Sequence, residues 1–219
     1  MIIRSAAISV LTFAVATGGS GSHAQTPSED AQFNAATQAV RDRDFRLAVA
    51  LFQPLAEADI PDAQFNLAVL LREGRGLPQN HVEALYWSAL SLLSESTYAK
   101  DMVGQLIDSL PPIAREGVVE RLLLRLTSQA EAGHTDAPRK VARVYAEFMA
   151  DPDTRLAYIW FSICYALGDD SCLEGRDKMA GEIDTKDLAA VQSEAGETFA
   201  RLPFANRIAI ELDPKNSEN

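Results

Sequence analysis

The sequence predicts an all-α fold, a short α-solenoid of antiparallel helix pairs, and three observations support this prediction. Apolar residues recur at three- and four-residue spacing, strand-like alternation is hard to find, and turn-forming residues separate the apolar runs. The segments between these turns have roughly 10–18 residues, which is a normal helix length. Connections this short place successive helices antiparallel.

The expected helices and turns follow one another along the chain. Apolar runs with helical spacing cover Phe45–Leu55, Ala63–Leu71 and Val82–Leu93. Turns are expected at Asp59–Pro61, Gly74–Asn80, Pro111–Pro112, Gly133, Asp151–Asp153 and Gly168–Ser171. A terminal repeat needs a polar outer face, and the polar helix expected at Lys186–Arg201 is a candidate for that cap.

Both ends of the chain are expected to lie outside the helical domain. Residues 1–24 contain Arg4, an apolar run from Ala6 to Val15, and Ser22 and Ala24 as an S-x-A cleavage site, which together predict a secretory signal peptide. An uncleaved membrane anchor is the alternative, although the run is shorter than the ~20 residues that span a bilayer. We expect a flexible linker at residues 25–34, the repeat domain at 35–205 and a polar C-terminal tail at 206–219.

The charge balance argues against nucleic acid as a partner. Removal of the signal peptide removes Arg4 from the 20 basic residues, so 19 face 31 acidic ones and the net charge becomes about −12. This field repels a phosphate backbone, and no local basic patch is visible in the sequence. The acidic residues are otherwise typical of a well solvated surface.

The chain has two cysteines, Cys164 and Cys172. Export would carry them into a compartment where disulfides persist, and a bond closing so short a loop would stabilise the fold by roughly 2–3 kcal/mol. We therefore favour a disulfide over two small buried apolar side chains. A redox role is disfavoured because the spacing is not C-x-x-C.

Internal comparison indicates a tandem duplication of a unit of about 73 residues. Residues 54–87 align with residues 128–160, first at an offset of 74 and, after one deletion in the loop, at 73. The matched pairs include Ala56 with Ala130, Ala63 with Ala137, Ala68 with Ala142, Pro78 with Pro152, Ala84 with Ala157 and Trp87 with Trp160. Small residues allow helix axes to approach, while tryptophans fill the remaining gaps.

These residues resemble the Sel1-like repeats, relatives of the tetratricopeptide repeat. In the first unit the matching or conservatively replaced positions are Ala63, Leu67, Ala68, Leu71, Gly74, Gly76, Leu77, Pro78, Ala84 and Trp87. In the second unit they are Ala130, Gly133, Ala137, Val141, Ala142, Tyr145, Ala157, Trp160 and Gly168. The resemblance covers about residues 48–93 and 126–172. It departs from the pattern at Ala68 and Ala142, which replace a glycine, and in the second loop FMADPDT, which lacks both glycines, so the curvature of the array is left open.

The resemblance assigns structural roles to the first loop and to the cysteines. Gly74 and Gly76 are expected to end one helix in left-handed backbone geometry, and Pro78 and Asn80 to set up the next. A phosphate-binding loop would need a preceding strand and a Gly-Lys-Ser/Thr ending, which are missing. The resemblance also places Cys164 and Cys172 across the Gly168 turn, where a disulfide would link successive helices.

In related repeat folds the first helix of each pair lines a concave, partner-binding face. By that resemblance we expect Phe65, Val69 and Arg72, with Arg139 and Arg143, to contact a carboxylate-bearing segment of a protein partner. The alternative is that Phe65 and Val69 belong to the core and the arginines are merely solvated.

The sequence predicts no catalytic constellation, no metal site and no cofactor. His81 and His134 have no metal-ligand spacing, no G-x-S-x-G elbow is present, and neither cysteine has a plausible histidine partner. The predicted function is therefore protein–protein interaction by an exported, periplasmic, non-enzymatic protein. Because periplasmic relatives hold envelope sensors or assemblies in check, the resemblance permits a regulatory role. A cell-wall or β-lactam hydrolase, as suggested for cysteine-rich relatives, and a structural spacer are the alternatives.

Overall fold

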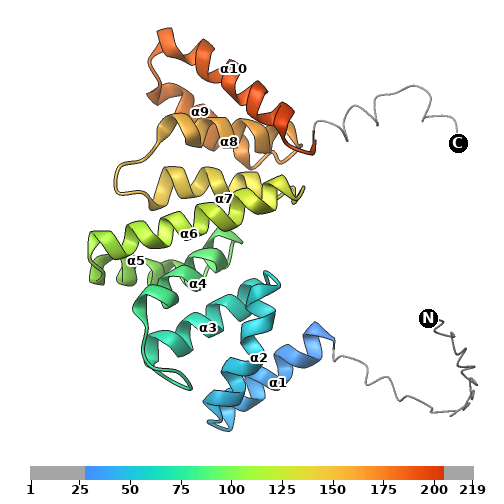
Figure 1. Ribbon diagram of the computed structural model, residues 1–219, viewed down its shortest axis with the longest axis vertical. Coiled ribbons are helices and arrows are strands. Elements are labelled where there is room, and N and C mark those ends of the chain that lie inside the picture. Colours follow the sequence, from blue (N-terminus) through green and yellow to red (C-terminus); the bar gives the residue numbers. More distant parts are fainter. Residues whose placement is uncertain (1–27, 205–219) are drawn as a thin grey trace, which may run out of the picture.

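A computed structural model describes residues 28–204, and the regular secondary structure of these residues is entirely helical (Figure 1). The α-helices are α1 (Glu29–Arg41), α2 (Phe45–Glu57), α3 (Pro61–Glu73), α4 (His81–Leu93), α5 (Ala99–Ser109), α6 (Pro112–Glu131), α7 (Ala137–Arg143), α8 (Thr154–Ala166), α9 (Cys172–Glu182) and α10 (Thr185–Arg201). A π-helical turn, η1 (Val144–Phe148), continues α7. The described residues contain no strand, which confirms the all-α prediction.

Most helices pack against the next helix in the chain. Contacts join each helix to the next from α1 through α5 and from α6 through α9, while α4 also packs against α6, and α8 against α10. Figure 1 shows the result as a stack along the long axis, with α1 at one end and α10 at the other. The short antiparallel solenoid expected from the sequence is therefore the observed architecture.

The described helices begin earlier than the predicted domain boundary. α1 starts at Glu29, and the Ser28 side chain accepts a hydrogen bond from the Ala31 amide at 3.3 Å as its N-cap. The linker expected at residues 25–34 is therefore wrong for residues 29–34. The predicted signal peptide and the C-terminal tail lie outside the described residues.

The first loop has the expected helix-ending geometry. Gly74 caps α3 with φ of 69°, and Gly76 follows with φ of 80°, both in the left-handed region that favours glycine. The Asn80 side chain then caps α4 by accepting from the Glu83 amide at 3.1 Å. Gly76 also lies against α2, because a Cβ built there would come within 2.3 Å of the Phe45 carbonyl oxygen.

The structure repeats itself at the offset found in the sequence. α4 and α8 start at residues 81 and 154, and α5 and α9 start at residues 99 and 172, a separation of 73 in both cases. The left-handed turn residues also match, Asp59 with Gly133 at offset 74 and Glu95 with Gly168 at offset 73. The two units therefore share helix positions and turn geometry.

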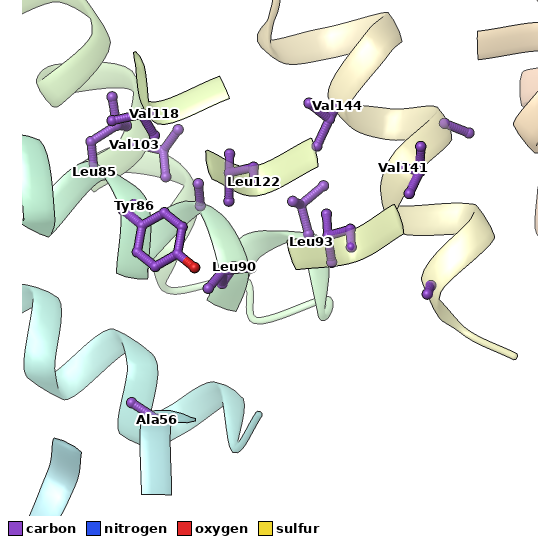
Figure 2. Close-up of a cluster of buried hydrophobic side chains, with 14 of the residues drawn as sticks. Ala56, Leu85, Tyr86, Leu90, Leu93, Val103, Val118, Leu122, Val141 and Val144 are labelled. Atoms are coloured by element: carbon purple, nitrogen blue, oxygen red, sulfur yellow. The ribbon is translucent and has the colours of Figure 1, made fainter. Parts of the chain in front are cut away.

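The matched small residues lie in the core of the stack. Ala56, Ala63, Ala68 and Ala84 and their four counterparts are all fully buried. Trp160 is 9% exposed, and Trp87 is half-buried against the same core with its ring 5.1 Å from that of Tyr86. This core is continuous between the units, since one cluster of buried side chains includes Leu93 of α4, Leu122 of α6 and Val141 of α7 (Figure 2).

The second unit carries the predicted disulfide. Cys164, near the end of α8, is bonded to Cys172 at the start of α9, with their Cα atoms 6.1 Å apart. Both side chains are fully buried. The bond links two successive helices across the Gly168 turn, as expected.

We predict that Gly76→Ala lowers the free energy of unfolding by about 2–3 kcal/mol, because it combines a backbone clash with a left-handed φ. Urea denaturation followed by helical circular dichroism measures the change. Gly104→Ala is the matched control, since Gly104 lies within α5 with open space around its Cβ position, and it should raise stability by about 0.5–1 kcal/mol. Equal effects of the two substitutions would contradict the close contact at Gly76.

We predict that Cys164→Ser combined with Cys172→Ser lowers the free energy of unfolding by about 2–3 kcal/mol through loss of the cross-link in the unfolded chain. Thiol titration of the denatured wild-type chain should detect no free thiol until a reductant is added. Two free thiols without reductant would show that the bond does not form in the isolated protein.

Candidate functional site

The residues of α3 predicted to bind a partner are only partly available. Phe65 and Val69 are half-buried against the core, and the Phe65 ring lies 6.3 Å from the ring of exposed Tyr98. Arg72 is half-exposed near the end of α3. Within residues 28–204, Arg72 forms no ion pair.

The predicted arginines of α7 are held by the fold. Arg139 forms an ion pair with Glu95 in the turn after α4, and its Nε lies 3.3 Å from an Asp169 carboxylate oxygen. Arg143 donates to the Leu92 carbonyl oxygen at 3.1 Å and forms two hydrogen bonds with Glu147. Both side chains are about one-fifth exposed. These arginines tie α7 to the end of α4, a structural role that the sequence did not indicate.

The five predicted residues therefore do not form one packed face. α3 packs against α2 and α4, whereas α7 packs against α6, η1 and α8. Two of them reach the turn between α4 and α5, Phe65 through Tyr98 and Arg139 through Glu95. Binding by these residues stays a prediction.

Polar contacts anchor the long helix α6 across the first unit. Asp59, in the turn after α2, accepts hydrogen bonds from Arg125 at 2.8 Å and from Gln129 at 2.6 Å. Burial disfavours the charged form of Arg125, but the hydrogen bond and charge of Asp59 outweigh it and raise the pKa of the guanidinium. Nearer the middle of α6, Arg121 forms two hydrogen bonds with the Glu83 carboxylate. These contacts fix the position of α6 relative to α2 and α4.

The N-terminal half of α6 forms one wall of an apolar cavity of about 510 Å³. The opposite wall is the end of η1 with the following segment, residues 147–151, and α4 and α5 contribute Leu85 and Ile107. The principal apolar lining residues are Leu85, Ile107, Val119, Leu123, Phe148 and Met149. Leu85 and Val118, which Figure 2 shows among the buried core side chains, both line the cavity, so the cavity borders the core.

Acidic side chains surround this cavity. Glu116, Glu120, Glu147 and Asp151 line it together with one basic residue, Arg115. Glu147 is paired with Arg143, whereas the other three carboxylates are exposed and form no ion pair with residues 28–204. An apolar floor with a negative rim is a surface that can accept an apolar segment carrying positive charge.

Sequence reasoning did not find this cavity. One signal pointed toward it, because the second loop lacks both glycines of the first. The exposed apolar residues of α6, Ile113 and Leu124, are 75% and 74% exposed but do not line the cavity. The periodicity of α6 alone could not show which neighbouring segment leaves a gap beside it.

Two carboxyl or phenol groups within residues 28–204 have shifted pKa values, and neither shift favours acid–base chemistry. Burial raises the pKa of Tyr145, and the negative charge of Asp153 adds to this effect. Burial also opposes ionisation of Asp136, but the hydrogen bond and charge of Lys140 outweigh it and lower the pKa of that carboxyl. Both shifts move away from neutral pH, whereas general acid–base catalysis needs a pKa near it.

The potential metal ligands are already bonded. Cys164, Asp169 and Cys172 lie close together, and among residues 28–204 they form the one acidic, histidine or cysteine cluster with metal-ligand spacing. Both sulfur atoms belong to the disulfide, so they do not present thiolates to a metal. His81 lies at the start of α4, and His134 is exposed in the turn before α7.

Comparison with protein families identifies the repeat. The Sel1 repeat model matches residues 30–60, 61–91 and 147–169. The chain contains Sel1 repeats. The first Sel1 match covers α1 and α2, which sequence analysis assigned to the resemblance only in part, and the second covers α3 and most of α4. Sel1 repeats generally mediate protein–protein interaction.

Comparison with solved structures includes a crystal structure of a Sel1 repeat protein from Oxalobacter formigenes. It is 20% identical, with a TM-score of 0.29, over 62% of this chain and 49% of that chain. The Sel1-repeat chain thus spans about half the length of that protein. The search of curated proteins found no match to this chain. None of the helices in residues 28–204 has the length and apolar character needed to cross a membrane.

We predict that Arg143→Glu lowers the free energy of unfolding by about 1–2 kcal/mol, because it removes the bond to the Leu92 carbonyl and places a carboxylate beside Glu147. Arg72→Glu should change it by less than about 0.5 kcal/mol. Chemical denaturation of both variants tests this. A similar, small effect of both substitutions would show that the contacts of Arg143 do not stabilise the stack. In that case a loss of partner binding in an Arg143 variant could be assigned to a lost contact with the partner.

Proposed function

We propose that this Sel1-repeat protein is an exported, periplasmic protein that binds another protein and thereby regulates an envelope sensor or assembly. The observation that carries the binding part is the open apolar cavity between α6 and residues 147–151. Its lining side chains extend the core to the surface, so a partner's side chains can bury apolar area there. The Sel1 repeats on either side of α5 and α6 support the same conclusion.

Two features support export. The segment 1–24 has the composition of a signal peptide, with Arg4 before an apolar run and Ala24 at the cleavage position. In addition, Cys164 and Cys172, the two cysteines of the chain, are joined in a buried disulfide. Disulfides of this kind persist in oxidising compartments such as the bacterial periplasm.

We predict that the full-length chain, expressed in its native host, is recovered from the periplasmic fraction with its N-terminus at Gln25. Chemical crosslinking in the periplasm should join the protein to one specific protein partner. If the partner contacts the predicted residues of α3, the crosslink should be lost in the Arg72→Glu variant. Mass spectrometry of the purified, crosslinked product identifies the N-terminus and the partner.

Several results would contradict this proposal. Recovery of the uncleaved chain from the cytoplasm would rule out export, and a chain without a specific crosslink would leave no support for partner binding. Turnover of muropeptides or β-lactams by the purified protein would instead favour the hydrolase alternative. A catalytically inactive preparation of a known hydrolase serves as the control for contaminating activity.

A further inference from the structure

The two units differ at the place where the first loop closes on the neighbouring helix. In the first unit, Gly76 lies so close to α2 that a Cβ would come within 2.3 Å of the Phe45 carbonyl oxygen. The Arg75 guanidinium covers the Phe45 ring, with Cζ 5.1 Å from the ring centroid. Glycine, arginine and phenylalanine thus close the space between the loop and the start of α2.

In the second unit the same three positions hold different residues. At offset 74, Phe45 corresponds to Val119, Arg75 to Met149 and Gly76 to Ala150. The aromatic ring and the guanidinium are both lost, and a methyl group replaces the hydrogen that permits the close approach. The loop also leaves its helix differently, through the π-helical turn η1 instead of a left-handed glycine.

The apolar cavity lies at this altered position. Val119, Met149 and Ala150 all line it, from the two walls that meet in the first unit. Figure 1 shows the N-terminal end of α6 and the connection from α7 to α8 on the same side of the stack. The cavity therefore occupies the position at which the first unit has a closed contact between its loop and its helix.

The residues missing from the second unit indicate what would fill the space. The first unit fills it with an aromatic ring covered by a positively charged side chain. The rim of the cavity has the complementary charge, with exposed Glu116, Glu120 and Asp151 against one cation, Arg115. The chain as a whole has a net charge of −11, which also attracts a basic segment.

We propose that this cavity, between α6 and residues 147–151, binds a protein segment in which an aromatic or large aliphatic side chain is flanked by arginine or lysine. The proposal rests on the proposed function, because it defines the partner chemistry at the same site. The aromatic or aliphatic side chain enters between Val119 and Met149, and the basic side chains pair with Glu116 and Glu120 at the rim. Burial of the apolar side chain supplies affinity, while the charges select basic over acidic segments.

A pair of synthetic peptides tests the chemistry of the partner. Both are short and fluorescein-labelled, with one tryptophan and two leucines at helical spacing. One carries arginine at the flanking positions and the other carries glutamate. We expect the full-length disulfide-bonded protein to bind the arginine peptide at one-to-one stoichiometry and the glutamate peptide at least about tenfold more weakly, measured by fluorescence anisotropy.

Two sets of variants locate the binding. Glu116→Lys combined with Glu120→Lys should raise the Kd of the arginine peptide about tenfold. The matched control, Glu131→Lys combined with Glu197→Lys, changes the total charge equally at exposed positions outside the cavity and should leave the Kd within about twofold. Val119→Phe combined with Met149→Arg and Ala150→Gly rebuilds the residues of the first unit and should also weaken binding about tenfold. Circular dichroism confirms that each variant is folded.

Other outcomes would overturn the proposal. Equal effects of the cavity and control charge reversals would mean that binding follows only total charge, and equal affinity for both peptides would exclude the proposed selectivity. A dimer that Val119→Phe dissociates in analytical ultracentrifugation would make a second copy the occupant. Tighter peptide binding after deletion of residues 205–219 would make the chain's own C-terminal segment the occupant.

This test can fail separately from the proposed function. A partner crosslinked in the host whose capture is unchanged by Glu116→Lys with Glu120→Lys would retain partner binding and reject the cavity as its site. Both proposals would be supported if the cavity variant lost the partner while the control variant retained it, and if the crosslinked partner segment had basic residues beside its apolar side chain. Peptide binding in the cavity without any partner in the host would support the cavity chemistry and reject the proposed function.

Discussion

Close packing of helices on buried alanines is the constraint on which this structure depends. One helix pair cannot bury its apolar face alone, so each pair must stack on the next. Ala56, Ala63, Ala68 and Ala84, with their counterparts in the second unit, are fully buried. A larger side chain at these positions would separate the helix axes, because the surrounding core is already closely packed. The spacing of the alanines therefore sets the distance between repeats.

Polar contacts at two turns also hold the stack together. Asp59 and Glu95 occupy left-handed backbone geometry without being glycine, and both form ion pairs with a later helix, Asp59 with α6 and Glu95 with α7. The equivalent residues of the second unit are Gly133 and Gly168, which adopt this geometry at little steric cost. The first unit thus combines turn formation with attachment of the second unit, because these two turn residues hold α6 and α7 in place.

Duplication followed by divergence gives one molecule two versions of the same contact. The version built from Phe45, Arg75 and Gly76 is closed and contributes to the fold. The version with Val119, Met149 and Ala150 is open, because smaller and uncharged side chains leave the space unfilled. A binding surface can arise in this way without any new element, since the helices on either side are already fixed by the repeat.

The sequence by itself predicted most of the helices, the turns, the repeat offset and the disulfide, but it did not predict the start of α1. Each depends on residues that are near in the chain or on a repeated pattern, such as the apolar spacing of α3, the glycines after it and the short loop between Cys164 and Cys172. The tertiary structure alone decided that Arg139 and Arg143 are held by intramolecular contacts, because their partners Glu95 and Leu92 lie more than forty residues away in the chain. It also decided where the surface is open. A cavity depends on how far two segments stand apart after packing, and that distance is set by the sum of many side-chain volumes rather than by any local pattern.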